Sequence, residues 1–265
     1  MKKILIPTDF SANAMKSADI AAKLAEKSKA ELILFHAYHV PGTGRPVMID
    51  ISDVLRKEAI EKLEDEKNRI LNNHKIKVVI DTEYGPTVPL IADKADKIKA
   101  DLIVMGTKGA SGLQEYFFGS NTSGMIRETK IPILAIPEGY FNGKPMSIVF
   151  AWDLNEVNKN EIDTIEDLAY LFDAEIKILH INEGSDAIVD EVLLKDFVST
   201  MKNTSYEIIH AENVEEALIE YLKENNGILS LIARKHGFLE KMFHKSITKA
   251  ITNHSFNPIL IMKAS

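Results

Sequence analysis

The sequence predicts an α/β protein made of two consecutive domains, each with a parallel β-sheet covered by helices. Short apolar runs of strand length alternate with longer stretches of helical periodicity, which is typical of helix-covered parallel sheets. The chain has 265 residues, about twice the usual size of a single domain. The order of apolar runs in the first half also returns in the second half.

Five strands and four helices are expected in the first half. The strands are short apolar runs at 3–7, 31–37, 76–82, 101–105 and 131–136. The first helix follows an N-cap at Ser11, and the second spans 51–72 after a loop at 41–46. The third helix follows Gly85-Pro86, and the fourth runs from Gly119 to Thr129. The apolar positions of the first helix are Ala14, Ala18, Ala21, Ala22 and Leu24, and those of the charged second helix are Val54, Leu55, Ile60 and Leu63.

The second half is a copy of the first. Asp9 and Asp153 are 144 positions apart, and so are His36 and His180. The distance falls to 127 between Gly106 and Ala233, so the second copy has lost most of its residues around its second helix. The sequence therefore predicts a first domain at 1–138, a linker at 139–145 and a second domain at 146–265.

A glycine-rich segment follows the expected fourth strand. Gly106, Gly109 and Gly112 lie in a loop, and Gly119-Ser120 opens the next helix, with Ser120 a suitable N-cap. A strand, a glycine-rich loop and a helix start together present backbone N–H groups to a phosphate, because glycine allows positive φ and close approach. The spacing is neither a P-loop nor a dinucleotide fingerprint. From the glycines alone, a phosphate site and a plain surface loop both remain open.

Met105 followed by Gly106-x2-Gly109-x9-Gly119-Ser120 resembles the signature of the ATP-binding universal stress proteins, and the repeat extends the resemblance to both halves. It implies two tandem doubly wound parallel five-stranded sheets of order 3-2-1-4-5, with helices on both faces. In that order strands 1 and 4 are neighbours whose connections leave to opposite sides, which is where ligands bind. Asp9 ends strand 1 and Gly106 ends strand 4, so both are expected at one site.

The resemblance also implies the roles of single residues. Asp9 would accept a hydrogen bond from a nucleoside hydroxyl or amino group, although a turn or capping carboxylate is the alternative. The backbone of Ala37 would contact adenine, whereas His36 is interpreted as a structural histidine because it recurs as His180. Asn121 replaces a residue that is often apolar in the family. The expected nucleotide-binding residues are Pro7, Thr8, Asp9, Ala37, Met105, Gly106, Gly109, Gly119, Ser120 and Asn121.

The second half lacks this signature, so no ATP is expected there. Ala233 replaces the first glycine and His244 replaces Gly119. The basic residues of this region are Arg234, Lys235, His236 and Lys245. They could hold another anion, although a solvated loop face is the simpler interpretation. A distinct ligand of the second half is the other open alternative.

Composition excludes several function classes. The net charge of −7 argues against a nucleic-acid surface, and no apolar run approaches the roughly 18 residues of a membrane span. The absence of cysteine excludes disulfides and thiolate chemistry. The eight histidines show no metal-binding spacing, and no base and nucleophile pair is evident, so neither catalytic nor metal-binding residues are expected. The expected location is the cytoplasm.

The resemblance implies a nucleotide-dependent stress-response or signalling module that binds ATP with Mg2+ in its first half. The protein partner is unknown. The two halves would form a pseudo-symmetric pair within the chain through their fifth strands, and a homodimer is a further option. The alternatives are a scaffold that binds no nucleotide and a slow ATP-hydrolysing enzyme.

Overall fold

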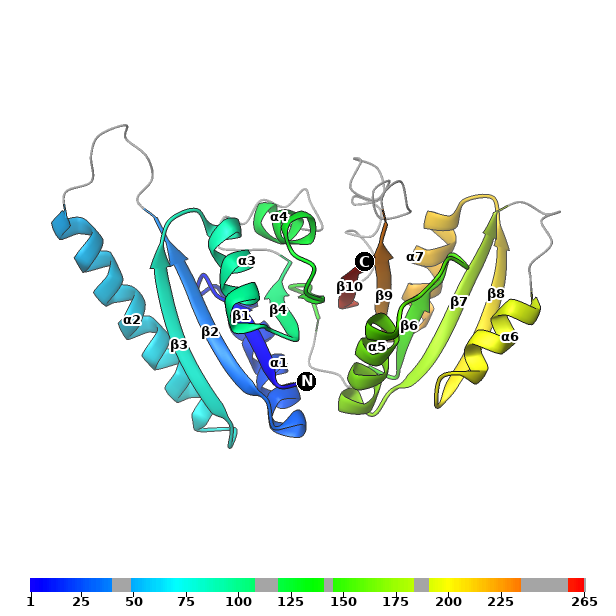
Figure 1. The fold of residues 1–265 in the computed structure, drawn as a ribbon, viewed down its shortest axis with the longest axis horizontal. Coiled ribbons are helices and arrows are strands. Elements are labelled where there is room, and N and C mark those ends of the chain that lie inside the picture. The colour runs from blue at the N-terminus through cyan, green and yellow to red at the C-terminus, as the bar shows by residue number, and fades with distance from the viewer. Residues whose placement is uncertain (40–48, 108–118, 141–144, 184–190, 235–256, 265) are drawn as a thin grey trace. The chain divides into compact units, whose positions relative to one another are not determined.

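The structure, a computed structural model, describes residues 1–39, 49–107, 119–140, 145–183, 191–234 and 257–264 (Figure 1). Contacts between Cα atoms divide the chain into two compact units, the first ending at Glu138 and the second beginning at Gly139. Each unit is an α/β unit with one parallel sheet.

The sheet of the first unit has the strand order β3-β2-β1-β4-β5. Its strands are β1 (Lys3–Pro7), β2 (Glu31–Tyr38), β3 (Lys77–Tyr84), β4 (Leu102–Gly106) and β5 (Ile133–Ile136). All neighbouring strands in this sheet are parallel. The expected order 3-2-1-4-5 is therefore confirmed in this unit, and it places the carboxyl ends of β1 and β4 side by side.

Four helices cover the first sheet: α1 (Ala12–Ser28), α2 (Ile49–Leu71), α3 (Thr87–Ile98) and α4 (Ser120–Glu128). Helix α1 contacts α2, and α3 contacts α4. Right-handed crossovers place the first pair on one face of the sheet and the second pair on the other. The middle strand β1 lies between these layers, and Ile4, Leu5 and Ile6 are fully buried.

The first two helices show what the sequence predicted well and less well. Ser11 caps α1 as expected, because its Oγ accepts a hydrogen bond from the Ala14 N–H at 3.2 Å. All five predicted apolar residues of α1 are buried. In α2, Leu63 is buried, but Val54 is 62% exposed and Ile60 37% exposed. The buried face of α2 uses Ala59, Glu66 and Ile70 instead, so part of its core contact is polar.

The second unit repeats this plan in the order β8-β7-β6-β9-β10, again with parallel neighbours. Its elements are β6 (Ser147–Ala151), α5 (Lys159–Phe172), β7 (Glu175–Glu183), α6 (Glu191–Ser199), β8 (Thr204–Ala211), α7 (Val214–Glu224), β9 (Gly227–Ala233) and β10 (Ile259–Lys263). Helix α6 has 9 residues where α2 has 23. The residues lost from the second copy are thus mainly those of its second helix.

Candidate functional site

A cleft of about 610 Å³ opens at the carboxyl ends of β1, β2 and β4 in the first unit. This is the edge at which doubly wound sheets bind ligands. Nine of the ten predicted nucleotide-binding residues line it: Pro7, Thr8, Asp9, Ala37, Met105, Gly106, Gly119, Ser120 and Asn121. The tenth, Gly109, lies outside the described residues. Residues that are more than 100 positions apart in the sequence therefore meet in one cleft.

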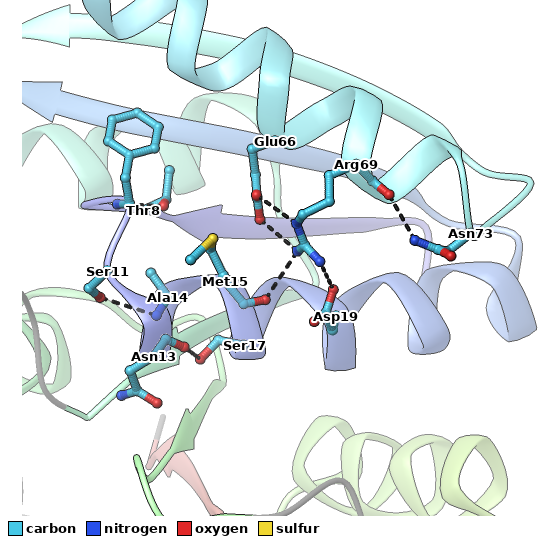
Figure 2. Close-up of polar contacts among 11 residues, drawn as sticks. Thr8, Ser11, Asn13, Ala14, Met15, Ser17, Asp19, Glu66, Arg69 and Asn73 are labelled. Atoms are coloured by element: carbon cyan, nitrogen blue, oxygen red, sulfur yellow. Dashed lines mark hydrogen bonds and ion pairs between the residues drawn. The ribbon is translucent and has the colours of Figure 1, made fainter.

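The turn after β1 contributes Thr8, Asp9 and Phe10 to the cleft lining. Figure 2 shows Thr8 and, at the end of the turn, Ser11. The Asp9 Oδ1 accepts a hydrogen bond from the Ser11 N–H at 3.1 Å, and the Thr8 Oγ1 accepts one from the Phe10 N–H at 3.0 Å. These bonds hold Phe10 at a φ of 62°, a left-handed conformation that is uncommon for a bulky residue. Asp9 therefore accepts a hydrogen bond within the turn, which was the alternative to its role in ligand binding, and the two roles are compatible.

His36 lies beside this turn and bonds to its backbone. Its Nδ1 is 2.7 Å from the Thr8 carbonyl oxygen, which can only accept, so Nδ1 carries the proton. Burial lowers the pKa of His36, and it outweighs the bond to Thr8, which favours the charged ring. The ring centroids of His36 and Phe10 are 4.6 Å apart. A neutral ring with a protonated Nδ1 keeps Nε2 as a hydrogen-bond acceptor.

The other flank of the cleft is formed by the end of β4 and the start of α4. The Thr107 N–H donates to the Ile136 carbonyl at 2.9 Å, and the Thr107 carbonyl accepts from the Gly119 N–H at 2.5 Å. The Thr122 hydroxyl donates to the Gly106 carbonyl at 3.0 Å. The first bond joins the strand end to β5, and the other two join it to the helix start, although residues 108–118 lie outside the described part.

The cap of α4 differs from the prediction by one residue. Gly119 is the N-cap, and Ser120 is the first helical residue, so the expected capping role of Ser120 is wrong. Gly119 has a φ of −58°, so positive φ is not what this glycine provides. The first bond of the helix runs from the Ser123 N–H to the Gly119 carbonyl. By helix geometry, the N–H groups of Ser120, Asn121 and Thr122 have no acceptor in a preceding turn, and they are suited to an anion.

Helix α2 supplies a wall of the cleft that the sequence did not suggest. Its cleft-lining residues Leu55, Glu58, Ala59 and Lys62 follow the spacing of a single helical face. The Lys62 ammonium is 2.6 Å from the Glu58 carboxylate and 5.7 Å from the centroid of the Phe10 ring. Because this face mixes apolar and charged residues, hydrophobic periodicity could not identify it.

At the corresponding corner of the second unit, Arg234 contacts the residues of the turn after β6. The Arg234 Nε is 3.4 Å from the Asp153 carboxylate, and another Arg234 nitrogen donates to the Glu156 carbonyl at 2.6 Å. The Arg234 side chain is only 20% exposed and pairs with Asp153, so the solvated loop face expected for the basic residues does not describe Arg234 itself. Lys235, His236, His244 and Lys245 lie outside the described residues.

Across the residues that the structure describes, no group of three or more His, Asp or Glu side chains could hold a metal ion. In the same part of the chain, no helix is both long and apolar enough to span a membrane.

Comparison with known proteins identifies the family. The sequence pattern described as the universal stress protein family matches residues 1–137. A universal stress protein of Methanocaldococcus jannaschii is 33% identical over 139 residues, which are 51% of this chain and 81% of that protein. A second, from Mycobacterium tuberculosis, is 30% identical over 140 residues, 51% of this chain and 95% of that protein.

Solved structures extend the similarity to both units. The crystal structure of a universal stress protein from Archaeoglobus fulgidus covers 99% of this chain and 96% of its own, with a TM-score of 0.75 and 19% identity. At that identity the likeness concerns the fold alone. Another universal stress protein, solved in complex with cAMP, covers 51% of this chain and 96% of its own, with a TM-score of 0.42 and 24% identity. The chain belongs to the universal stress protein family.

Proposed function

We propose that the cleft of the first unit binds ATP and that the chain acts as a nucleotide-dependent stress-response or signalling module. The observation that carries this proposal is the convergence of Asp9, Gly106 and the N-terminus of α4 on one cleft at the switch point of the sheet. Each of these features alone is common, but together they offer complementary groups to a nucleotide.

The strand order supports an orientation for the ligand. Strand β1 lies between β2 and β4, so Asp9 is in the middle of the cleft, with Ala37 on one side and Gly106 on the other. The start of α4 is on the Gly106 side and would receive the phosphates, because helix N-termini favour anions. The ribose would then lie at Asp9 and the base beside Ala37.

Mg2+ would be held chiefly by the phosphates of the nucleotide, since this ion usually keeps several waters and takes few protein ligands. The residues beside the start of α4 would contribute backbone N–H groups to the phosphates. One nucleotide per chain is proposed, because Arg234 occupies the equivalent corner of the second unit. A protein partner and pairing through the fifth strands remain predictions.

Calorimetric titration with ATP, with and without Mg2+, tests the proposal on the whole chain. We expect one site per chain with a dissociation constant in the micromolar range, about −8 kcal/mol. Two sites would contradict the interpretation of the second unit. No binding would favour the scaffold that binds no nucleotide, and turnover well above background would favour the enzyme.

A charge at the start of α4 tests where the phosphates bind. Ser120→Asp adds a carboxylate to the first turn, which favours the helix by about 0.3–1 kcal/mol but repels a phosphate. We therefore expect ATP affinity to fall about tenfold or more while thermal stability is kept. Ser123→Asp adds the same charge to the same helix outside the cleft-lining residues, and should cost less affinity. Equal effects of the two substitutions would argue against phosphate binding at this helix start.

A further inference from the structure

The base end of the proposed site has a wall made by α2. The residues Leu55, Glu58, Ala59 and Lys62 form one helical face that lines the cleft, and α2 packs on β2 and β3. Strand β2 is on the side of β1 away from β4. The α2 wall is therefore at the opposite end of the cleft from the α4 N-terminus, where a nucleotide would place its base.

This wall is fixed to the rest of the unit by Arg69, one turn beyond Glu66 on α2 (Figure 2). The Arg69 guanidinium is 2.8 Å from the buried Glu66 carboxylate, 2.7 Å from the Asp19 carboxylate and 3.4 Å from the Met15 carbonyl. Asp19 and Met15 belong to α1, which begins just after the Asp9 turn. Arg69 thus fastens α2 to the helix that follows Asp9, so the wall and the centre of the site are held together.

The polar groups of the wall include acceptors beside a donor. The Lys62 ammonium contacts the Glu58 carboxylate and the Phe10 ring, and the carboxylate has a second oxygen and several lone pairs left to accept with. The His36 ring, held through Nδ1 by Thr8, adds an Nε2 acceptor to the residues that line this end. Glu58 and Lys62 are 54% and 51% exposed in their side chains, so a ligand can reach them.

We infer that Glu58, paired with Lys62, is a specificity-determining residue that selects a base bearing an amino group. Adenine carries an exocyclic amine that donates, whereas hypoxanthine carries a carbonyl oxygen at the same position that accepts. The Glu58 carboxylate can accept a hydrogen bond from the amine of adenine but faces an unpaired acceptor in the carbonyl of hypoxanthine. This inference rests on the proposed nucleotide site and names the base that the site prefers.

The test compares ATP with inosine triphosphate, which differs at this position of the base, by calorimetry on the whole chain. The wild type should bind ATP about tenfold more tightly. The double substitution Glu58→Lys with Lys62→Glu keeps an ion pair on α2 but puts donors at position 58. It should reduce the preference to about one or invert it.

Inorganic tripolyphosphate, which has no base, separates the two ends of the cleft. Its affinity should be unchanged by the double substitution. The matched control exchanges Glu64 and Lys67, an ion pair 3.1 Å apart on the same helix outside the cleft-lining residues, and should keep the ATP preference. Equal binding of both nucleotides by the wild type, or an unchanged preference in the double variant, would overturn the inference. Binding of neither nucleotide would instead refute the proposed function itself.

Discussion

The carboxyl ends of β1 and β6 share one turn but present different surroundings. In both units an aspartate Oδ1 accepts from the N–H two residues later, at 3.1 Å for Asp9 and 3.2 Å for Asp153. The next residue is left-handed in both, with φ of 62° at Phe10 and 60° at Leu154. A histidine from the second strand also bonds to the same backbone carbonyl position, through His36 and His180.

The difference lies in the residues around this shared turn. Trp152 replaces Thr8, stacks on Phe197 of α6 at 4.2 Å and is only 5% exposed. Arg234 replaces Thr107 and pairs with Asp153. The aspartate and the histidine are therefore parts of a scaffold that both units share. A binding site is better recognised from the small residues that leave space around the turn than from its charged residue.

The largest expected effect on stability concerns the residue before the aspartate, which is Trp152 in the second unit and Thr8 in the first. Trp152→Ala removes a buried stacked ring and should lower the free energy of unfolding by about 3–5 kcal/mol. Thr8→Ala removes a hydroxyl that accepts one backbone hydrogen bond and should cost about 1 kcal/mol. Urea unfolding followed by circular dichroism measures both. Trp152→Phe keeps a ring and should cost much less than Trp152→Ala; similar losses for Trp152→Ala and Thr8→Ala would contradict this view of the two corners.

Effects of intermediate size are expected from substitutions that separate the hydrogen bond each aspartate makes in the turn from its negative charge. Asparagine keeps an oxygen for the turn bond, so Asp9→Asn should be more stable than Asp9→Ala by about 1 kcal/mol. If ATP binds as proposed, Asp9→Asn should also lower its affinity about tenfold. Asp153→Asn removes the charge beside Arg234, a partly exposed pair, and should cost up to about 1 kcal/mol without changing ATP affinity.

Urea titration and calorimetry on Asp9→Asn, Asp9→Ala and Asp153→Asn check these expectations. The single tryptophan of the chain, Trp152, lies next to Asp153, so its fluorescence reports on the second corner specifically. A loss of ATP affinity in Asp153→Asn equal to that in Asp9→Asn would show that both corners bind the nucleotide.

The sequence predicted the features that depend on pattern. Apolar runs and repeats predicted the strands, and the strand order implied by the family resemblance predicted that Asp9 and Gly106 lie at one site. Features that depend on single side chains were missed. Arg234 reaches a carboxylate 81 positions earlier in the chain, and no periodicity signals such a contact. The α2 wall was missed because Glu58 and Lys62 resemble an ordinary solvated ion pair, and the α4 cap was misplaced by one residue, a usual error at helix ends.

The smallest expected effect concerns the histidine that both units share. Because burial lowers the pKa of folded His36 below its ordinary value of 6.5, the unfolded chain binds the proton first as the pH falls. The His36 contribution to stability is therefore fully present above pH 6.5 and is lost as the pH falls towards the folded pKa. The resulting change in the free energy of unfolding with pH stays below about 1.4 kcal/mol per pH unit, the maximum for one titrating group.

Unfolding at about pH 7.5 and 5.5 measures this loss, and His36→Asn should reduce it, because an amide can still donate to the Thr8 carbonyl but does not titrate in this range. Proton resonances of the imidazole followed by NMR give the pKa of His36 directly. His180→Asn, the same change in the second unit, should leave the His36 titration as it is. A His36 pKa at or above 6.5 would mean that the ring is hydrated and that its Nε2 is not a dependable acceptor at the base end of the cleft.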